Sequence, residues 1–121
     1  MKTVDTGREA ESCACTYLQQ HGLSLLERNY RSRRGEIDLI MNDGKYLVFV
    51  EVRYRRGSTF GSGAESVDGR KQAKISACAQ YYLQQYPHAA SRPCRFDVIS
   101  ISGAREPRKI QWTRDAFPAL G

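Results

Sequence analysis

Two consecutive apolar segments carry charged residues at positions where a buried strand normally has none. The segments are Gly35-Glu36-Ile37-Asp38-Leu39-Ile40 and Val48-Phe49-Val50-Glu51-Val52-Arg53, separated by Asn42-Asp43-Gly44. Two β-prone runs joined by an Asp-Gly turn indicate a β-hairpin, here with strands over residues 36–41 and 45–54. Carboxylates among apolar strand residues cost free energy unless they are paired or bind a metal. The pattern therefore predicts an acidic site on a sheet.

Helical periodicity appears before and after this hairpin. Residues 5–20 predict a helix in which Thr6 and Glu9 have capping-box spacing, and Gly22 is expected to stop it. Its apolar stripe consists of Ala10, Cys13, Ala14, Tyr17 and Leu18. Residues 66–86 predict a second helix, ended by Pro87, with an apolar face of Ile75, Cys78, Ala79, Tyr82 and Leu83.

Strand-like segments fill the remaining positions. Residues 23–30 predict a first strand and residues 95–102 a later one, while residues 109–113 predict a short edge strand before an irregular tail. The order is α-β-β-β-α-β-β, in which an antiparallel meander is followed by a right-handed parallel crossover through the second helix. This order predicts an α/β fold with a mixed sheet flanked by helices.

The register of the hairpin decides whether its charges meet. Strand side chains alternate between faces, so Glu36 shares a face with Asp38, and Glu51 shares one with Arg53. A two-residue turn at Asp43-Gly44 pairs Glu36 with Glu51, and makes Asp38 and Glu51 diagonal neighbours about 7–8 Å apart. All four charged side chains then share one face, whereas a one-residue shift would separate them.

Two carboxylates at this separation suit Mg²⁺ or Mn²⁺, which prefer oxygen ligands. Such an ion lowers the pKa of a bound water and neutralises charge on a phosphate, and a neighbouring cation such as Arg53 adds to that stabilisation. The alternative is a solvated sheet face on which Asp38 and Glu51 only pair with arginines.

The distribution of cations favours a polyanionic partner. The chain has a formal net charge of +6, and basic residues flank both acidic strands: Arg31, Arg33, Arg34, Arg53, Arg55 and Arg56. A hairpin brings these two clusters to one end, which predicts a basic rim that holds a DNA backbone over the acidic site. Because the sequence has no base-reading motif, binding is expected to depend on DNA structure rather than sequence. The alternative is a solvated basic surface.

Other features predict an ordinary intracellular domain. The four cysteines and two histidines lack zinc-site spacing, so free thiols that act as small hydrophobes are expected. The 121 residues suit one domain, residues 1–121. No apolar run approaches the roughly 20 residues that span a bilayer, and the N-terminus has no apolar signal region. We therefore expect a cytoplasmic protein without membrane contact.

The combination of these motifs resembles a known family over nearly the whole chain. The matching residues are Gly7, Glu11, Ala14, Tyr17-Leu18, Arg28-Asn29, the two acidic strand segments, Phe60-Gly61, Glu65-Ser66-Val67, Lys71 and Arg95-Phe96-Asp97-Val98-Ile99. They resemble the YraN-like family of small bacterial proteins, which are classed as relatives of the PD-(D/E)xK nucleases. Within that superfamily the resemblance is greatest to archaeal Holliday-junction resolvases.

The resemblance implies a restriction-endonuclease-like core and roles for individual residues. Asp38 and Glu51 match the two metal-binding acids, and Glu11 matches a helical glutamate that resolvases add to the site, although a solvent-facing glutamate is the alternative. Lys71 could reach the phosphate, or be an ordinary amphipathic lysine. Arg53 stands where the superfamily has lysine, and arginine is bulkier, planar and effectively never deprotonated.

The presence of arginine instead of lysine at position 53 leaves two candidate functions. The first is a Mg²⁺- or Mn²⁺-dependent endonuclease acting on structured or branched DNA, with Glu11, Asp38, Glu51 and Arg53 as catalytic residues. The second is a nuclease-fold DNA-binding or adaptor protein without turnover, because arginine replaces lysine. A basic protein-interaction module ranks after both. By analogy with resolvases, which cut two strands symmetrically, a homodimer is expected.

Overall fold

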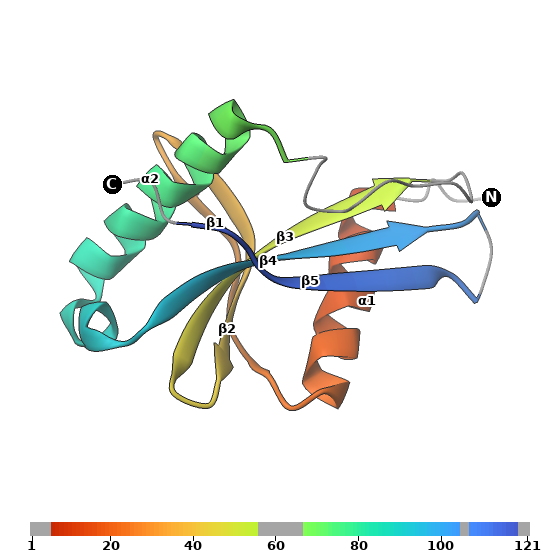
Figure 1. Ribbon diagram of the computed structural model, residues 1–121, viewed down its shortest axis with the longest axis horizontal. Helices are drawn as coiled ribbons and strands as arrows, with labels where there is room; N and C mark the ends of the chain where they lie inside the picture. The colour runs from red at the N-terminus through yellow and green to blue at the C-terminus, as the bar shows by residue number, and fades with distance from the viewer. Residues whose placement is uncertain (1–5, 56–66, 105–106, 119–121) are drawn as a thin grey trace.

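Five strands form one mixed sheet that has a helix on each side (Figure 1). The computed structural model describes residues 6–55, 67–104 and 107–118. The elements are α1 (Thr6–Gln20), β1 (Ser24–Ser32), β2 (Gly35–Asp43), β3 (Tyr46–Arg55), α2 (Gly69–Gln85), the 3-10 helix η2 (Pro87–Ser91), β4 (Cys94–Ser102) and β5 (Lys109–Phe117). The strands lie in sequence order, and only β3 and β4 are parallel among these pairs. The predicted order α-β-β-β-α-β-β and the mixed sheet are confirmed.

Helix α1 covers one face of the sheet and ends where the sequence predicts. Gly22 has a φ of 95° and its N–H donates to the Gln19 carbonyl, while the Leu23 N–H donates to the Leu18 carbonyl. This pair of bonds is a Schellman motif, which favours glycine at the left-handed position. Leu18 and Leu23 are both buried in the same cluster, so the cap also directs the chain into β1. The Thr6 side chain of the expected capping box lies outside the described residues.

Helix α2 covers the opposite face and begins at Gly69, later than predicted. Asp68 is the N-cap, and its Oδ1 accepts a hydrogen bond of 2.9 Å from the Lys71 N–H. An N-cap carboxylate satisfies one of the free N–H groups at a helix start, and this fixes Lys71 in the first turn. At its other end the helix stops at Gln85, before Pro87, as expected, although η2 follows where a loop was predicted.

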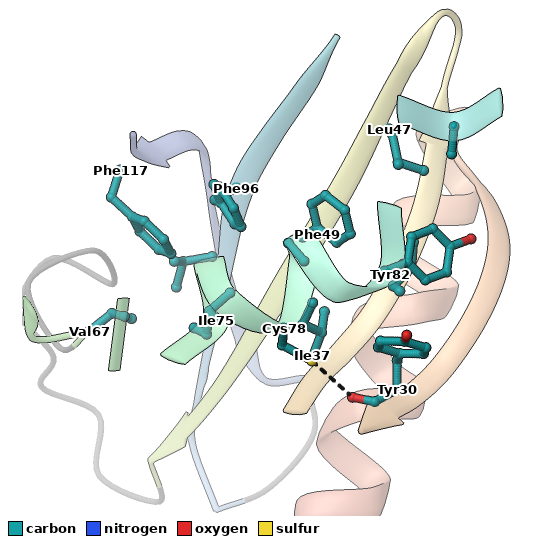
Figure 2. Close-up of a cluster of buried hydrophobic side chains, with 14 residues drawn as sticks. Tyr30, Ile37, Leu47, Phe49, Val67, Ile75, Cys78, Tyr82, Phe96 and Phe117 are labelled. Atoms are coloured by element: carbon teal, nitrogen blue, oxygen red, sulfur yellow. Dashed lines mark hydrogen bonds between the residues drawn. The ribbon is translucent and has the colours of Figure 1, made fainter. Parts of the chain in front are cut away.

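Two separate hydrophobic cores hold the helices against the sheet. Under α2, Ile75, Cys78 and Tyr82 pack on Phe49, and Phe49 also stacks on Phe96 at a centroid distance of 5.5 Å (Figure 2). Under α1, the buried residues include Ala10, Ala14, Cys15, Leu18, Leu39, Met41, Val48 and Val50. Cys15 and Cys78 are free thiols within these cores and pack there as small hydrophobes.

The β2–β3 hairpin has a different register from the one predicted. Asp43 pairs with Tyr46, so the two turn residues are Gly44 and Lys45 rather than Asp43 and Gly44. Gly44 has a φ of 61°, the sign that a type II′ turn requires at its first central position. The resulting shift is two residues, and an even shift preserves the predicted face of each side chain wherever the strands are regular. It brings Asp38 level with Glu51, where Phe49 was expected.

Strand β5 is longer than the predicted edge strand and replaces the expected irregular tail. It continues to Phe117, which stacks on Phe96 at 5.0 Å. Asp97, which is fully buried, holds the two strands together because its carboxylate accepts from Arg95, from the Trp112 indole and from the Asp115 N–H. The Arg95-Phe96-Asp97 segment of the family resemblance is therefore explained by structure and lies outside the cavity described below.

Neither helix of the described segments is long and apolar enough to cross a membrane.

Candidate active site

The site lies where β2 and β3 separate. The two strands pair from Asp43↔Tyr46 to Leu39↔Val50; beyond that point β2 stays paired with β1, and β3 stays paired with β4. Asp38 and Glu51 are the first residues beyond the last pair. The Val52 N–H donates instead to Asp38 Oδ2 at 2.8 Å. Asp38 thus satisfies a backbone donor that the opened sheet leaves without a strand partner.

The backbone of β2 is irregular at the same point. Ile37 lies in the core under α2, whereas Leu39, two residues later, lies in the core under α1. A regular strand would put both side chains on one face. In the neighbouring strand β1, Asn29 has a φ of 51°, and its place in the register is opposite Asp38. Asparagine tolerates this left-handed conformation better than most residues, which gives a structural reason for asparagine at position 29.

A cavity of about 620 Å³ opens at this gap, between the first halves of the two helices. Its lining includes Glu11 from α1, Asp38 from β2, Glu51 and Arg53 from β3, and Lys71 from α2. These residues come from four elements and include all four predicted catalytic residues. Glu11 is half-buried, so it is not the solvent-facing helix glutamate that was the alternative.

The charges in this cavity are balanced in number. The acidic lining residues are Glu11, Glu36, Asp38, Glu51 and Asp68, and the basic ones are Arg53, Arg55, Arg70, Lys71 and Lys74. The carboxylates at positions 38 and 51 are buried, with 9% and 5% of each residue exposed. Arg55, Arg70, Lys71 and Lys74 are classed as exposed. The cavity therefore has a buried acidic centre and an exposed rim in which four basic residues outnumber the two exposed acids, Glu36 and Asp68.

Asp38 binds its proton unusually tightly. Burial of the carboxyl group and the nearby charge of Glu51 raise the pKa of Asp38 from 3.8 to about 8. The charge of Glu11 and a hydrogen bond with the Glu51 carboxyl add to this rise, and the hydrogen bond from Val52 opposes it. The carboxyl groups of Asp38 and Glu51 thus lie close together, away from water, and share a retained proton. A divalent cation can replace a proton in such a site.

Glu51 has the cationic partners. Lys71 Nζ lies 2.7 Å from Glu51 Oε2, and Arg53 Nη1 lies 3.7 Å from the same oxygen. The lysine contact is much shorter, and it comes from α2 rather than from the strand position that the resemblance assigns. Lys71 was expected either to reach the phosphate or to be an ordinary amphipathic lysine; its contact with Glu51 puts an ammonium group beside the acidic centre.

The donor set fits a hard cation. Asp38 and Glu51 supply carboxylate oxygens, the ligand type that Mg²⁺ and Mn²⁺ prefer. Within residues 6–55, 67–104 and 107–118, no three His, Cys, Asp or Glu side chains form a complete metal cage. Mg²⁺ sites commonly use one or two carboxylates and leave positions for water and phosphate, so two acids are a sufficient protein contribution.

The predicted nucleic-acid contacts divide between two places. Arg55 and Lys71 line the cavity just described, whereas Arg31, Arg33 and Arg34 line a second cavity of about 440 Å³ together with α2. The two arginine clusters were expected to form one rim; their described residues line two separate cavities, with the β1–β2 turn beside α2. Arg56 lies outside the described residues.

Sequence reasoning missed three charged lining residues of the first cavity: Asp68, Arg70 and Lys74. The signal for Asp68 was present, because a carboxylate before the first apolar position of a helix is a typical N-cap. Arg70 and Lys74 could have been found from Lys71, because they lie one and three residues from it on the same helix. The structure gives a reason for glycine at position 35: a Cβ there would lie 3.3 Å from both Lys74 Cβ and the Lys74 carbonyl oxygen, so glycine permits β2 to approach α2.

Comparison with known proteins places the chain in a family. A model of the uncharacterised protein family UPF0102 matches residues 10–101, which include Glu11, Asp38, Glu51 and Lys71. UPF0102 proteins of Nitrosococcus oceani and Pseudomonas savastanoi pv. phaseolicola are 52% and 54% identical over 93% and 92% of this chain, and over 91% of each relative. A UPF0102 protein of Pseudomonas aeruginosa is 45% identical over 95% of the chain and 94% of the relative. The chain belongs to the UPF0102 family.

Proposed function

We propose that this protein is a metal-dependent endonuclease that acts on branched or otherwise irregular DNA. The observation that carries the proposal is the contact of 2.7 Å between Lys71 Nζ and Glu51 Oε2, in the cavity that also contains Asp38. The nucleases that the sequence resembles combine two acids with a lysine, and the strand offers only Arg53 at the lysine position. Lys71 supplies the missing ammonium group from α2.

Asp38 and Glu51 are the residues that would hold Mg²⁺ or Mn²⁺. When bound, such an ion neutralises charge on the phosphate and lowers the pKa of a water molecule. For binding, Asp38 has to release the proton that its raised pKa retains near neutral pH. The Val52 N–H donates to Asp38 Oδ2 and so orients this carboxyl group in the metal-free protein.

The basic residues of the cavity would contact the phosphates of the DNA. An ammonium group has three N–H donors, so Lys71 can hold Glu51 and still donate to a phosphate oxygen. Arg53, which lies farther from Glu51, adds a second positive charge to the site. Arg55, Arg70 and Lys74 line the same cavity and suit phosphates on either side of the bond to be cut. Symmetric cutting of a junction needs two such sites, so a homodimer is part of the proposal.

The second candidate function is DNA binding without turnover, as in an adaptor protein. It is favoured by Arg53, because a planar arginine next to Glu51 cannot act where the chemistry needs a compact or titrating amine. It keeps the basic rim and the DNA contacts, and predicts that no metal ion produces cleavage.

A cleavage assay separates these functions. Labelled linear duplex, single-stranded and four-way-junction DNA would be incubated with Mg²⁺ or Mn²⁺, using the wild type and Glu51→Gln. The matched control is Glu36→Gln, which removes a carboxylate of the same cavity that is 46% exposed and pairs with Arg31 at 3.6 Å. We expect metal-dependent cutting that Glu51→Gln abolishes and Glu36→Gln retains.

The other outcomes are equally informative. Binding without cutting by the wild type would contradict the endonuclease and support the adaptor. Failure to bind any of the three DNA forms would contradict both, and would favour a protein-interaction module. Because phosphate contacts release counterions, DNA affinity should fall steeply with salt, and a flat dependence would argue against a basic DNA surface.

A further inference from the structure

The second cavity has a composition unlike that of the first. It is bounded on one side by Arg31 near the end of β1 and by Arg33 and Arg34 of the β1–β2 turn, and on the other side by Ala77, Tyr81 and Gln84 of α2. None of its described lining residues is acidic, whereas the first cavity has five acids. The ion pair between Arg31 and Glu36 spans 3.6 Å between exposed side chains, and such pairs are weak. The cavity is therefore suited to an anion without the aid of a metal.

The two cavities adjoin along one face of α2. Lys74 lines the first, and Ala77, Tyr81 and Gln84 line the second. Positions separated by three, four or seven residues lie on the same side of a helix, so these four side chains form a continuous row. The β1–β2 turn runs beside that row, with Arg34 at the second cavity and Gly35 at the first. A chain-like ligand could thus pass from one cavity to the other.

Tyr81 is the unusual residue in this row. It is a large side chain with 44% of its surface exposed, beside three arginines. Its hydroxyl oxygen accepts from Gln85 Nε2 at 3.3 Å, and its ring centre lies 6.4 Å from that of Tyr30. These contacts support the ring. Exposed aromatic rings in a basic groove are typical of single-stranded nucleic-acid sites, where they stack on bases.

We propose that the second cavity binds an unpaired stretch of the DNA strand that enters the first, with Tyr81 stacked on a base and Arg33 and Arg34 at phosphates. The inference rests on the proposed function for the role of the first cavity. Tyr81 follows Lys71 by ten positions of α2, or about 15 Å along the axis at 1.5 Å per residue. For intervening nucleotides that stay stacked as in B-form DNA, at 3.4 Å per nucleotide, this corresponds to about four nucleotides. The substrate class is therefore DNA with an unpaired segment about four nucleotides from the phosphate that is cut.

The test is a binding measurement without divalent metal. Fluorescence anisotropy in EDTA would compare labelled oligo(dT) with a duplex of equal length, using the wild type, Tyr81→Leu and Tyr81→Phe. We expect Tyr81→Leu to weaken oligo(dT) binding about tenfold because a stacked base is lost, and to change duplex binding less than twofold. Tyr81→Phe keeps the ring and should bind oligo(dT) within twofold of the wild type. Since Tyr81 is exposed, neither change should unfold the protein.

Three results would overturn this inference. They are an unchanged oligo(dT) affinity of Tyr81→Leu, an equal loss of affinity for the single strand and the duplex, and no oligo(dT) binding by the wild type. Because the measurement excludes metal, it is separate from cleavage. If the wild type cuts DNA with metal but Tyr81→Leu binds oligo(dT) as tightly as the wild type, only this inference is contradicted. If Tyr81→Leu selectively loses oligo(dT) affinity but the wild type cuts no DNA, the binding site is supported and the nuclease is contradicted.

Discussion

Replacement of Asp38 by asparagine should change how the stability of the metal-free protein depends on pH. The folded protein raises the pKa of Asp38 from 3.8 to about 8. Between these values the folded state holds a proton that the unfolded state has released. A carboxyl group with a raised pKa contributes most to stability below pH 4, and this contribution is lost as the pH rises towards 8.

The size of the effect follows from one proton. A difference of one bound proton changes the free energy of unfolding by about 1.4 kcal/mol per pH unit, so the wild type should lose about 3 kcal/mol between pH 5 and 7 through this group. Asp38 is only 9% exposed, so solvent screening does little to reduce the value. Asparagine carries no proton to lose and can still accept from the Val52 N–H. Asp38→Asn should therefore be the more stable protein at pH 7.

Urea denaturation at pH 5, 6, 7 and 8 in EDTA measures this difference. The control is Glu9→Gln, which removes an exposed carboxylate from the same helix as Glu11 and should leave the pH profile unchanged. Free energies of unfolding for wild type and Asp38→Asn that run parallel with pH would refute the description of Asp38 as a desolvated acid beside Glu51.

Two further predictions concern the same site and the fold. Binding of Mn²⁺ should displace the proton of Asp38, so calorimetry in buffers of different ionisation enthalpy should detect proton release below pH 8, and Asp38→Asn should abolish both release and tight binding. Asp97→Ala should destabilise the protein by about 3–5 kcal/mol, since it leaves Arg95, whose side chain is 11% exposed, without its main partner. Urea denaturation would measure this loss, and a loss below 1 kcal/mol would show that the network contributes little.

The hairpin shows what sequence could predict of the fold and the site. Alternation of apolar and charged residues predicted that Glu36, Asp38, Glu51 and Arg53 gather at one place, and all four line one cavity. It did not predict that β2 is irregular between Ile37 and Leu39, whose side chains lie in opposite cores. The register itself was wrong by two residues, because an Asp-Gly pair can occupy turn positions in more than one frame. The frame depends on pairing along the whole strand, which local turn preferences do not determine.

Lys71 shows why the remainder of the site could not be predicted. Periodicity placed it on the second helix, but its contact with Glu51 depends on where that helix crosses the sheet. The crossing is set by close packing of Gly35 on Lys74 and by the cap at Asp68, which involve segments far apart in sequence. The opening between β2 and β3 has the same origin, because each strand follows its other neighbour beyond Leu39.

The most direct test of the account asks whether Lys71 takes the part that lysine has in the strand of the resembled nucleases. Junction cleavage with Mg²⁺ or Mn²⁺ would be measured for the wild type, Lys71→Ala, Arg53→Ala, and the double variant Lys71→Ala with Arg53→Lys. Removing one preorganised charged group from such a site costs about 100-fold or more in rate, so Lys71→Ala should fall by that amount and Arg53→Ala by less. The double variant should recover part of the lost rate. Full activity of Lys71→Ala, or a larger loss from Arg53→Ala, would contradict the assignment.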